Sequence, residues 1–226
     1  MTYQSWKGIV RRRDGYGLLL IFLLVDYLIL SLVNSVRFGG LARSVPVALT
    51  VLLAVHTSNS RRVVVRAAQL AVASSLVFGA IEALTGSSDA GAICRLMVAL
   101  VLVISPIAIL RRILEHDKVT VETILGALDV YVVIGLIFAL LFSGLANLFG
   151  PPGFPRFLAQ TGAHPPASDY LYLSFVTLTT VGFGDITPFS NLARSVVVLE
   201  ALVGQIFLVT LVARLVSMYN SEKRST

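Results

Sequence analysis

Residues 168–188 read SDYLYLSFVTLTTVGFGDITP, and this stretch decides the fold that we expect. Its apolar part, 170–180, makes about three helical turns, whereas a helix that crosses a bilayer needs ~20 residues. Ser168 and Asp169 precede the apolar part and carry side-chain oxygens that suit a helix N-cap. The glycines that follow favour irregular backbone, which a membrane tolerates only where protein or water surrounds it. The stretch therefore predicts a re-entrant segment, in which a short helix enters the membrane and the chain returns.

Long apolar runs on both sides of this stretch indicate a membrane protein. Of the 226 residues, 56% are apolar and 13% are charged, against roughly 25% charged in soluble domains. Six runs are candidates for membrane-spanning helices: 17–36, 44–57, 67–85, 92–110, 123–149 and 191–217. The second run is short, so five spans are an alternative. The chain is predicted to be an all-α membrane protein with six transmembrane helices and the re-entrant segment between the fifth and sixth.

The basic residues indicate which way the chain faces. Most of the 18 lysines and arginines lie before the first run, between the second and third, between the fourth and fifth, and after the sixth. Because cytoplasmic loops are enriched in these residues, both termini are predicted to be cytoplasmic. The expected protein is integral and multi-pass, in a plasma or inner membrane. The clusters are read as topology signals, so no nucleic-acid partner is expected.

The string TTVGFGD at 179–185 resembles the selectivity filter of the potassium-channel family, whose TVGYG loop lines a pore with backbone carbonyls. The resemblance covers about residues 120–217, and it departs from the family at Phe183, where a tyrosine is usual. It implies that the filter consists of Thr180, Val181, Gly182, Phe183 and Gly184, with permeant K+ ions at the first four. Asp185 would lie at the outer mouth. A glycine-containing outer turn without an ion role is the alternative.

The apolar runs and the resemblance together divide the chain into five parts. They are a cytoplasmic N-terminal segment (1–16), a four-helix transmembrane module (17–112), an interfacial linker helix (113–122), a pore domain (123–217) and a cytoplasmic tail (218–226). The linker is expected because apolar and charged residues alternate there. In the pore domain, the resemblance implies an outer helix, an outer loop, a pore helix, the filter and an inner helix, in that order.

The inner helix carries further candidates for a role in conduction. The family spacing implies that Gln205, Leu208 and Val212 face the ion cavity below the filter. Gly204 falls where family members often have a hinge glycine. Membrane helices also use glycine where two helices approach closely, so a helix contact is the alternative for Gly204.

Glu200 is a carboxylic acid within an apolar run, and such acids usually have a partner or face a water-filled cavity. Its angle on the helix differs from that of Gln205. We therefore expect Glu200 behind the filter, near Ser174 or Thr177 of the pore helix, as a brace. Direct contact with the permeant ion is the alternative.

The resulting hypothesis is a potassium-selective channel made of four chains, because a closed ring of filter carbonyls needs four strands. Its expected partners are three more copies of the chain and membrane lipid. Residues 96–110 hold no basic residue, so an arginine voltage sensor is not expected. The three histidines, His56, His116 and His164, are scattered, so neither a metal site nor a Ser-His hydrolytic pair is indicated. No paired nucleophile and base occurs in the apolar runs, so an enzyme is not expected, and the only expected ligands are the permeant potassium ions, with no organic cofactor. The alternatives are a weakly selective cation channel, a non-conducting membrane binding protein and an intramembrane enzyme.

Overall fold

The computed structural model describes residues 16–32, 66, 69–70, 72–74, 77, 80–81, 84–85, 88–115, 120–153 and 165–224. Every regular element in these residues is helical. The helices are α2 (Tyr16–Leu32), α5 (Ser88–Leu102), α6 (Ile104–Glu115), α7 (Val121–Gly153), α8 (Ala167–Leu178) and α9 (Asn191–Arg224). The all-α fold predicted from the sequence is therefore confirmed for the described part of the chain.

Three helical stretches in the described residues are long and apolar enough to cross a membrane: Gly91–Arg111, Val121–Ala146 and Asn191–Arg214. They coincide with the fourth, fifth and sixth predicted runs. A shorter apolar helix, Tyr16–Val25, belongs to the first run. The run 44–57 lies outside the described residues, as do about half of the residues of 67–85 and all three histidines. The described part is thus that of an integral, multi-pass membrane protein.

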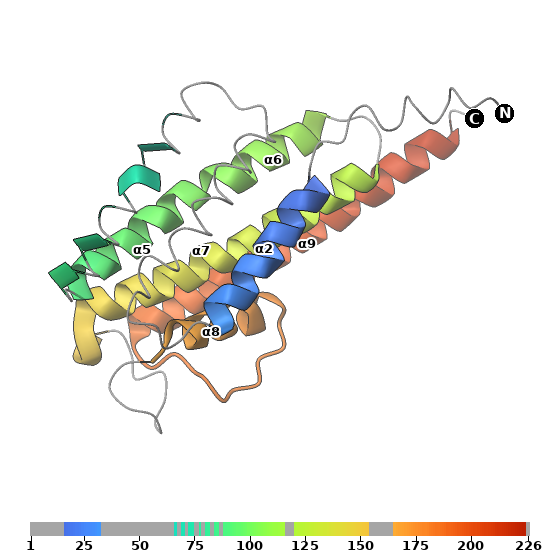
Figure 1. Cartoon of the computed structure of the whole chain (residues 1–226). Coiled ribbons are helices and arrows are strands. Elements are labelled where there is room, and N and C mark those ends of the chain that lie inside the picture. The colour runs from blue at the N-terminus through green and yellow to red at the C-terminus, as the bar shows by residue number, and fades with distance from the viewer. Residues whose placement is uncertain are drawn as a thin grey trace.

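Helix α7 is the centre of the described structure and packs against α2, α5, α6, α8 and α9. Figure 1 shows α5 and α6 following one another alongside α7, while α9 runs antiparallel to α7. Short α8 packs against both α7 and α9, and α2 also contacts it. The apolar window of α7 is 56% buried and that of α9 only 11% buried. A single chain therefore covers much of α7 and leaves α9 mostly uncovered.

A turn at Val103 separates α5 from α6 within the fourth run. Pro106 lies in the first turn of α6. Proline has no N–H to donate to the carbonyl four residues earlier, and its ring crowds that carbonyl, which here belongs to Leu102. The helix therefore ends at Leu102 and restarts at Ile104. The overall direction is kept, because the two pieces form one apolar stretch.

A pair of threonines begins α7 inside the segment predicted to be a linker. Thr120 Oγ1 accepts a hydrogen bond from Thr123 N at 3.2 Å, and Thr120 N donates to Thr123 Oγ1 at 3.3 Å. This reciprocal arrangement is a capping box with threonine in place of the usual glutamate. Residues 113–115 belong to α6, residues 121–122 belong to α7, and residues 116–119 lie outside the described residues.

The expected capping of α8 by Ser168 and Asp169 was wrong, because both residues lie inside its first turn. The N-cap is Pro166, with φ −65° and ψ 158° and no side-chain cap. Its carbonyl accepts Asp169 N at 3.0 Å. The proline ring already holds the φ angle that this position adopts, so no side-chain oxygen is needed to set the helix start. The helix therefore runs over Ala167–Leu178 rather than 170–180.

Candidate ion-conduction site

Helix α8 ends at the string that resembles a filter, and hydrogen bonds tie the first residues of that string back to the helix. Thr180 N donates to Thr177 O at 3.0 Å, and the N–H groups of Val181 and Gly182 donate to Val176 O at 3.0 and 3.3 Å. In a trans peptide the N–H and the preceding carbonyl point in opposite directions. The carbonyls of Thr180 and Val181 therefore point away from the end of α8.

Alternate residues of the string adopt a left-handed backbone. Thr180 has φ 60°, Gly182 has φ 56° and Gly184 has φ 79°. A Cβ on either glycine would meet no atom within 4 Å in the single chain. The requirement for glycine at these two positions is therefore conformational rather than steric, as a residue with a side chain resists positive φ. Thr180 adopts this conformation although it is β-branched, which is rare.

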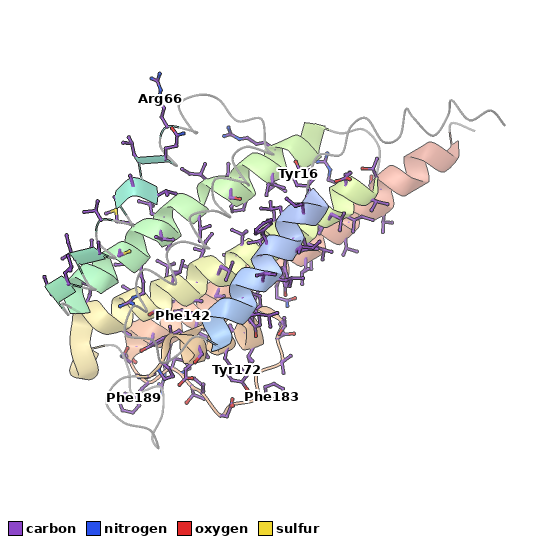
Figure 2. All side chains as sticks on the ribbon, viewed as in Figure 1. Tyr16, Arg66, Phe142, Tyr172, Phe183 and Phe189 are labelled. Atoms are coloured by element: carbon purple, nitrogen blue, oxygen red, sulfur yellow. The ribbon has the colours of Figure 1, made fainter. Side chains whose placement is uncertain are left out.

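The second half of the string, from Phe183 to Asp185, is held by Tyr172 of α8. The rings of Tyr172 and Phe183 stack, with centroids 6.3 Å apart and planes 5° apart, and Figure 2 shows the two side chains next to each other. Tyr172 Oη donates to Asp185 Oδ2 at 2.9 Å, and Asp185 Oδ1 accepts Ile186 N at 3.0 Å. Desolvation and the Asp185 acceptor raise the pKa of Tyr172. The phenol therefore keeps the proton that it donates.

Three polar groups meet behind α8. Ser174 Oγ lies 2.7 Å from Gly135 O of α7 and 2.5 Å from Glu200 Oε1 of α9, and both Ser174 and Glu200 are fully buried. The structure thus places Glu200 beside Ser174. Thr177, the other expected neighbour, is half-buried and gives its carbonyl to Thr180 N.

Helix α7 holds α8 at two further points that the sequence analysis missed. Tyr131 Oη donates to Leu178 O at 2.8 Å. A Cβ on Gly135 would lie 2.8 Å from Phe175 Cζ, so a side chain at this position would require the Phe175 ring to shift. The only sequence signals for these contacts are a tyrosine and a glycine within an apolar run, and neither is specific.

Gly204 lies at a close contact between α9 and α8. A Cβ there would be 2.6 Å from Leu178 Cδ1 and 3.4 Å from Leu178 O. This distance is too short for any side chain without a shift of the neighbour. Of the two interpretations left open for Gly204, the geometry directly supports the helix contact.

Residues 126–221 match the ion-channel family. The match runs from early α7 through α8 and the string at 179–185 to the end region of α9, and we call this the pore region. The family is one of ion channels and not of enzymes. Comparisons with curated proteins and with solved structures gave no match.

Within the pore region, the expected cavity residues lie on α9 with different exposure in the single chain. Gln205 is exposed, Leu208 is half-buried and Val212 is 56% exposed. Phe207 and Leu211, on another side of α9, pack against the core of the chain. Gln205 and Val212 are therefore free of the chain's own core and open to a further copy, to water or to lipid.

Asp129 is a buried acid of the pore region that the sequence analysis did not single out. Its side chain is completely buried in α7, and neither carboxyl oxygen has a hydrogen-bond partner among the described residues. An acid within the apolar run 123–149 was the available signal. It lies on a face of α7 that packs within the chain, so it is not part of the filter.

Proposed function

We propose that the chain is one subunit of a potassium-selective channel, and that the backbone of residues 180–184 is its filter. The alternation of left-handed φ at Thr180, Gly182 and Gly184 carries this proposal. A backbone that alternates between left-handed and ordinary residues turns successive carbonyls to the same side. Such a row of carbonyls replaces the hydration shell of a permeant cation.

Two further features support an ion path at this place. The carboxyl end of α8 is directly followed by the filter, and the partial negative charge of a helix carboxyl end favours a cation. Phe183 is 71% exposed and Val181 52% exposed in the single chain, so their apolar side chains need cover from outside it. On this proposal, K+ binds at Thr180, Val181, Gly182 and Phe183, and Asp185 is at the outer mouth.

The proposed working unit is a homotetramer. One chain supplies one filter strand, whereas a closed ring of carbonyls needs four. The apolar window of α9 is only 11% buried, which leaves an extended surface for the other copies and for lipid. We further propose six spans per subunit, both termini in the cytoplasm and a plasma or inner membrane as the location. The window Gly91–Arg111 contains arginine only near its ends, which supports conduction without an arginine voltage sensor.

A weakly selective cation channel is the second candidate, and Phe183 is the observation that favours it. The side chain has no hydroxyl, so a ring stack with Tyr172 holds the filter at this residue. A filter held less firmly discriminates less between ions of different size. Reversal potentials measured in mixed potassium and sodium separate the two candidates.

Rubidium uptake tests the proposed function. The purified full-length protein is reconstituted in potassium-loaded liposomes, and uptake is expected in wild type but not in Gly182→Asp, because a side chain there opposes the left-handed backbone. Ser195→Ala is the control, since among the described residues the Ser195 hydroxyl bonds only to Asn191 O of its own helix. Uptake by Gly182→Asp equal to that of wild type would disprove the filter assignment. A mass of the purified assembly other than four chains would disprove the tetramer.

A further inference from the structure

A buried chain of polar atoms connects the three helices of the pore region. It runs from the Gly135 carbonyl of α7 through the Ser174 hydroxyl of α8 to the Glu200 carboxyl of α9. Ser174 Oγ lies at 2.7 Å from the carbonyl oxygen and at 2.5 Å from Glu200 Oε1. These distances are at or below the usual O–H···O value of about 2.7–2.8 Å. Each contact therefore requires a hydrogen between its two oxygens.

The hydrogens available can be counted. A serine hydroxyl has one proton to donate, a backbone carbonyl has none, and an ionised carboxylate has none. One proton shared between two acceptors would leave both contacts long and bent, which the two distances contradict. Since the Gly135 carbonyl can only accept, the second proton must come from Glu200.

We infer that Glu200 is a protonated carboxylic acid that donates to Ser174, while Ser174 donates to the Gly135 carbonyl. The inference concerns regulation of the proposed channel and rests on the proposed function for its effect on conduction. Glu200 is a positioning residue, because it acts on the filter through α8. The proton decides whether the Ser174 hydroxyl bonds to both α7 and α9 or to α9 alone.

The surroundings of Glu200 support a neutral acid. Its side chain is 0% exposed, and Oε2 is buried with no hydrogen-bond partner among the described residues. An ionised carboxylate would leave that oxygen desolvated and without a partner, which is expensive. The groups facing it are Ser174 on α8, which is its hydrogen-bond partner, and Tyr131 on α7, whose phenol is neutral because it donates its proton to Leu178 O. Among the described residues, no basic side chain forms an ion pair with Glu200.

Loss of this proton changes the contacts of α8. The ionised carboxylate can only accept, so the Ser174 proton turns to Glu200 and the bond to Gly135 is lost. Because the protonated form is the one that links all three helices, the stabilisation is present at low pH and is lost as the pH rises. We expect alkaline pH to loosen α8 and reduce conduction.

Infrared spectroscopy tests the proton without any need for conduction. The carbonyl stretch of a protonated carboxylic acid is separate from the bands of a carboxylate. At neutral pH, the difference spectrum of wild type minus Glu200→Gln is expected to contain this acid band. Asp129, the other fully buried acid among the described residues, is present in both proteins and cancels, as does every other acid of the chain. Ser174→Ala is expected to shift the band, because the acid then lacks its acceptor. Absence of the acid band, or a band that Ser174→Ala leaves unchanged, would overturn the inference.

Rubidium uptake as a function of pH tests the consequence. From about pH 7 to about pH 10, wild-type uptake is expected to fall about tenfold, the effect of losing one strong buried hydrogen bond. Glu200→Gln is expected to conduct at neutral pH and to show no such fall, since its amide donates to Ser174 at every pH. Tyr131→Phe controls for the facing phenol and is expected to keep the fall. A fall that persists in Glu200→Gln, or one that disappears in Tyr131→Phe, would overturn the regulatory role.

The two tests separate this inference from the proposed function. An acid band in a protein that takes up no rubidium would support the proton on Glu200 and disprove the channel. Uptake without an acid band would support the channel and disprove the proton.

Discussion

At the scale of single residues, Thr180 is in a conformation that a β-branched residue resists. Its φ of 60° costs of order 1–3 kcal/mol, and such strain persists only where the surroundings impose it. The imposing contacts are the hydrogen bonds of Thr180 N and Val181 N to carbonyls of α8. Gly182 and Gly184 follow the same alternation without this penalty. The string therefore contains one strained residue, Thr180, and its backbone carbonyls at Thr180 and Val181 point away from the helix.

Asp129→Ala is expected to raise the free energy of unfolding. The wild-type carboxyl is completely buried without a hydrogen-bond partner among the described residues, and burial of such a group costs about 1–3 kcal/mol. Alanine removes the group and is the best helix former. Thermal denaturation in detergent measures the change. The neighbouring Val130→Ala is the control and is expected to destabilise by a similar amount, because it removes buried apolar atoms. A large loss of stability in Asp129→Ala would show that the carboxyl has a partner.

At the scale of elements, α8 depends on contacts with its neighbours because it is short. A helix of 12 residues is only marginally stable by itself. Three hydrogen bonds hold it in place. Ser174 bonds to Gly135 and Leu178 to Tyr131, both of α7, while Tyr172 bonds to Asp185 at the outer end of the proposed filter. Each of these hydrogen bonds can be removed separately by a substitution.

Tyr172→Phe is expected to reduce selectivity more than flux. The change removes the bond from Tyr172 to Asp185 and keeps the ring stack with Phe183. The outer end of the filter is then held by stacking alone, so the K+/Na+ permeability ratio is expected to fall severalfold. Reversal potentials in mixed salt provide the measurement. Tyr27→Phe keeps the ring contact of Tyr27 with Phe175 and is the matched control. An unchanged ratio in Tyr172→Phe would show that this bond does not support the filter.

Gly204→Ala is expected to destabilise the contact of α9 with α8. The added Cβ would be 2.6 Å from Leu178 Cδ1, and such overpacking costs typically about 1–3 kcal/mol. Leu178→Ala provides the space, so the double variant should recover part of the stability lost in Gly204→Ala. A double-mutant cycle from thermal denaturation measures this coupling. Strictly additive effects would contradict a direct contact between the two positions.

At the scale of the whole molecule, the difference in burial between α7 and α9 is the main feature. The apolar window of α7 is 56% buried and that of α9 is 11% buried. A helix that faces lipid on one side and water on another needs apolar residues on the first side and polar residues on the second. On the proposed arrangement, Gln205 faces the aqueous cavity, whereas Ile206 lines an apolar groove between α6, α7 and α9. The two positions are adjacent in sequence and differ in surroundings.

A thiol scan at these two positions tests the arrangement. Cys94 is buried and is the one cysteine of the chain, so Cys94→Ala provides the background. A water-soluble thiol reagent is expected to block rubidium uptake in Gln205→Cys, because thiolates react where water reaches them. Ile206→Cys is the control and is expected to resist the reagent. Equal block of both variants would contradict the cavity assignment of Gln205.

The local features of the described helices were determined by the sequence itself. The three long apolar runs became the helices of Gly91–Arg111, Val121–Ala146 and Asn191–Arg214, because in a membrane every backbone group must bond within its own segment. The sequence also predicted the short helix and the irregular backbone after it. The length of the apolar run and the glycines that follow it are local features, and they do not depend on how the helices pack. The role of the filter stays a prediction that reconstitution must test.

Only the tertiary structure decided which groups hold the pore helix. Tyr131 bonds to Leu178 across 47 residues of sequence, and Ser174 bonds to Gly135 across 39. Such pairs depend on how α7 and α8 cross, and no local pattern encodes that. The capping of α8 by Pro166 rather than by Ser168 or Asp169, in contrast, has a local cause, because the proline ring already holds the required φ angle. The protonation of Glu200 follows from a second acceptor, Gly135, that packing alone brings to Ser174, because a buried hydroxyl cannot donate one proton twice.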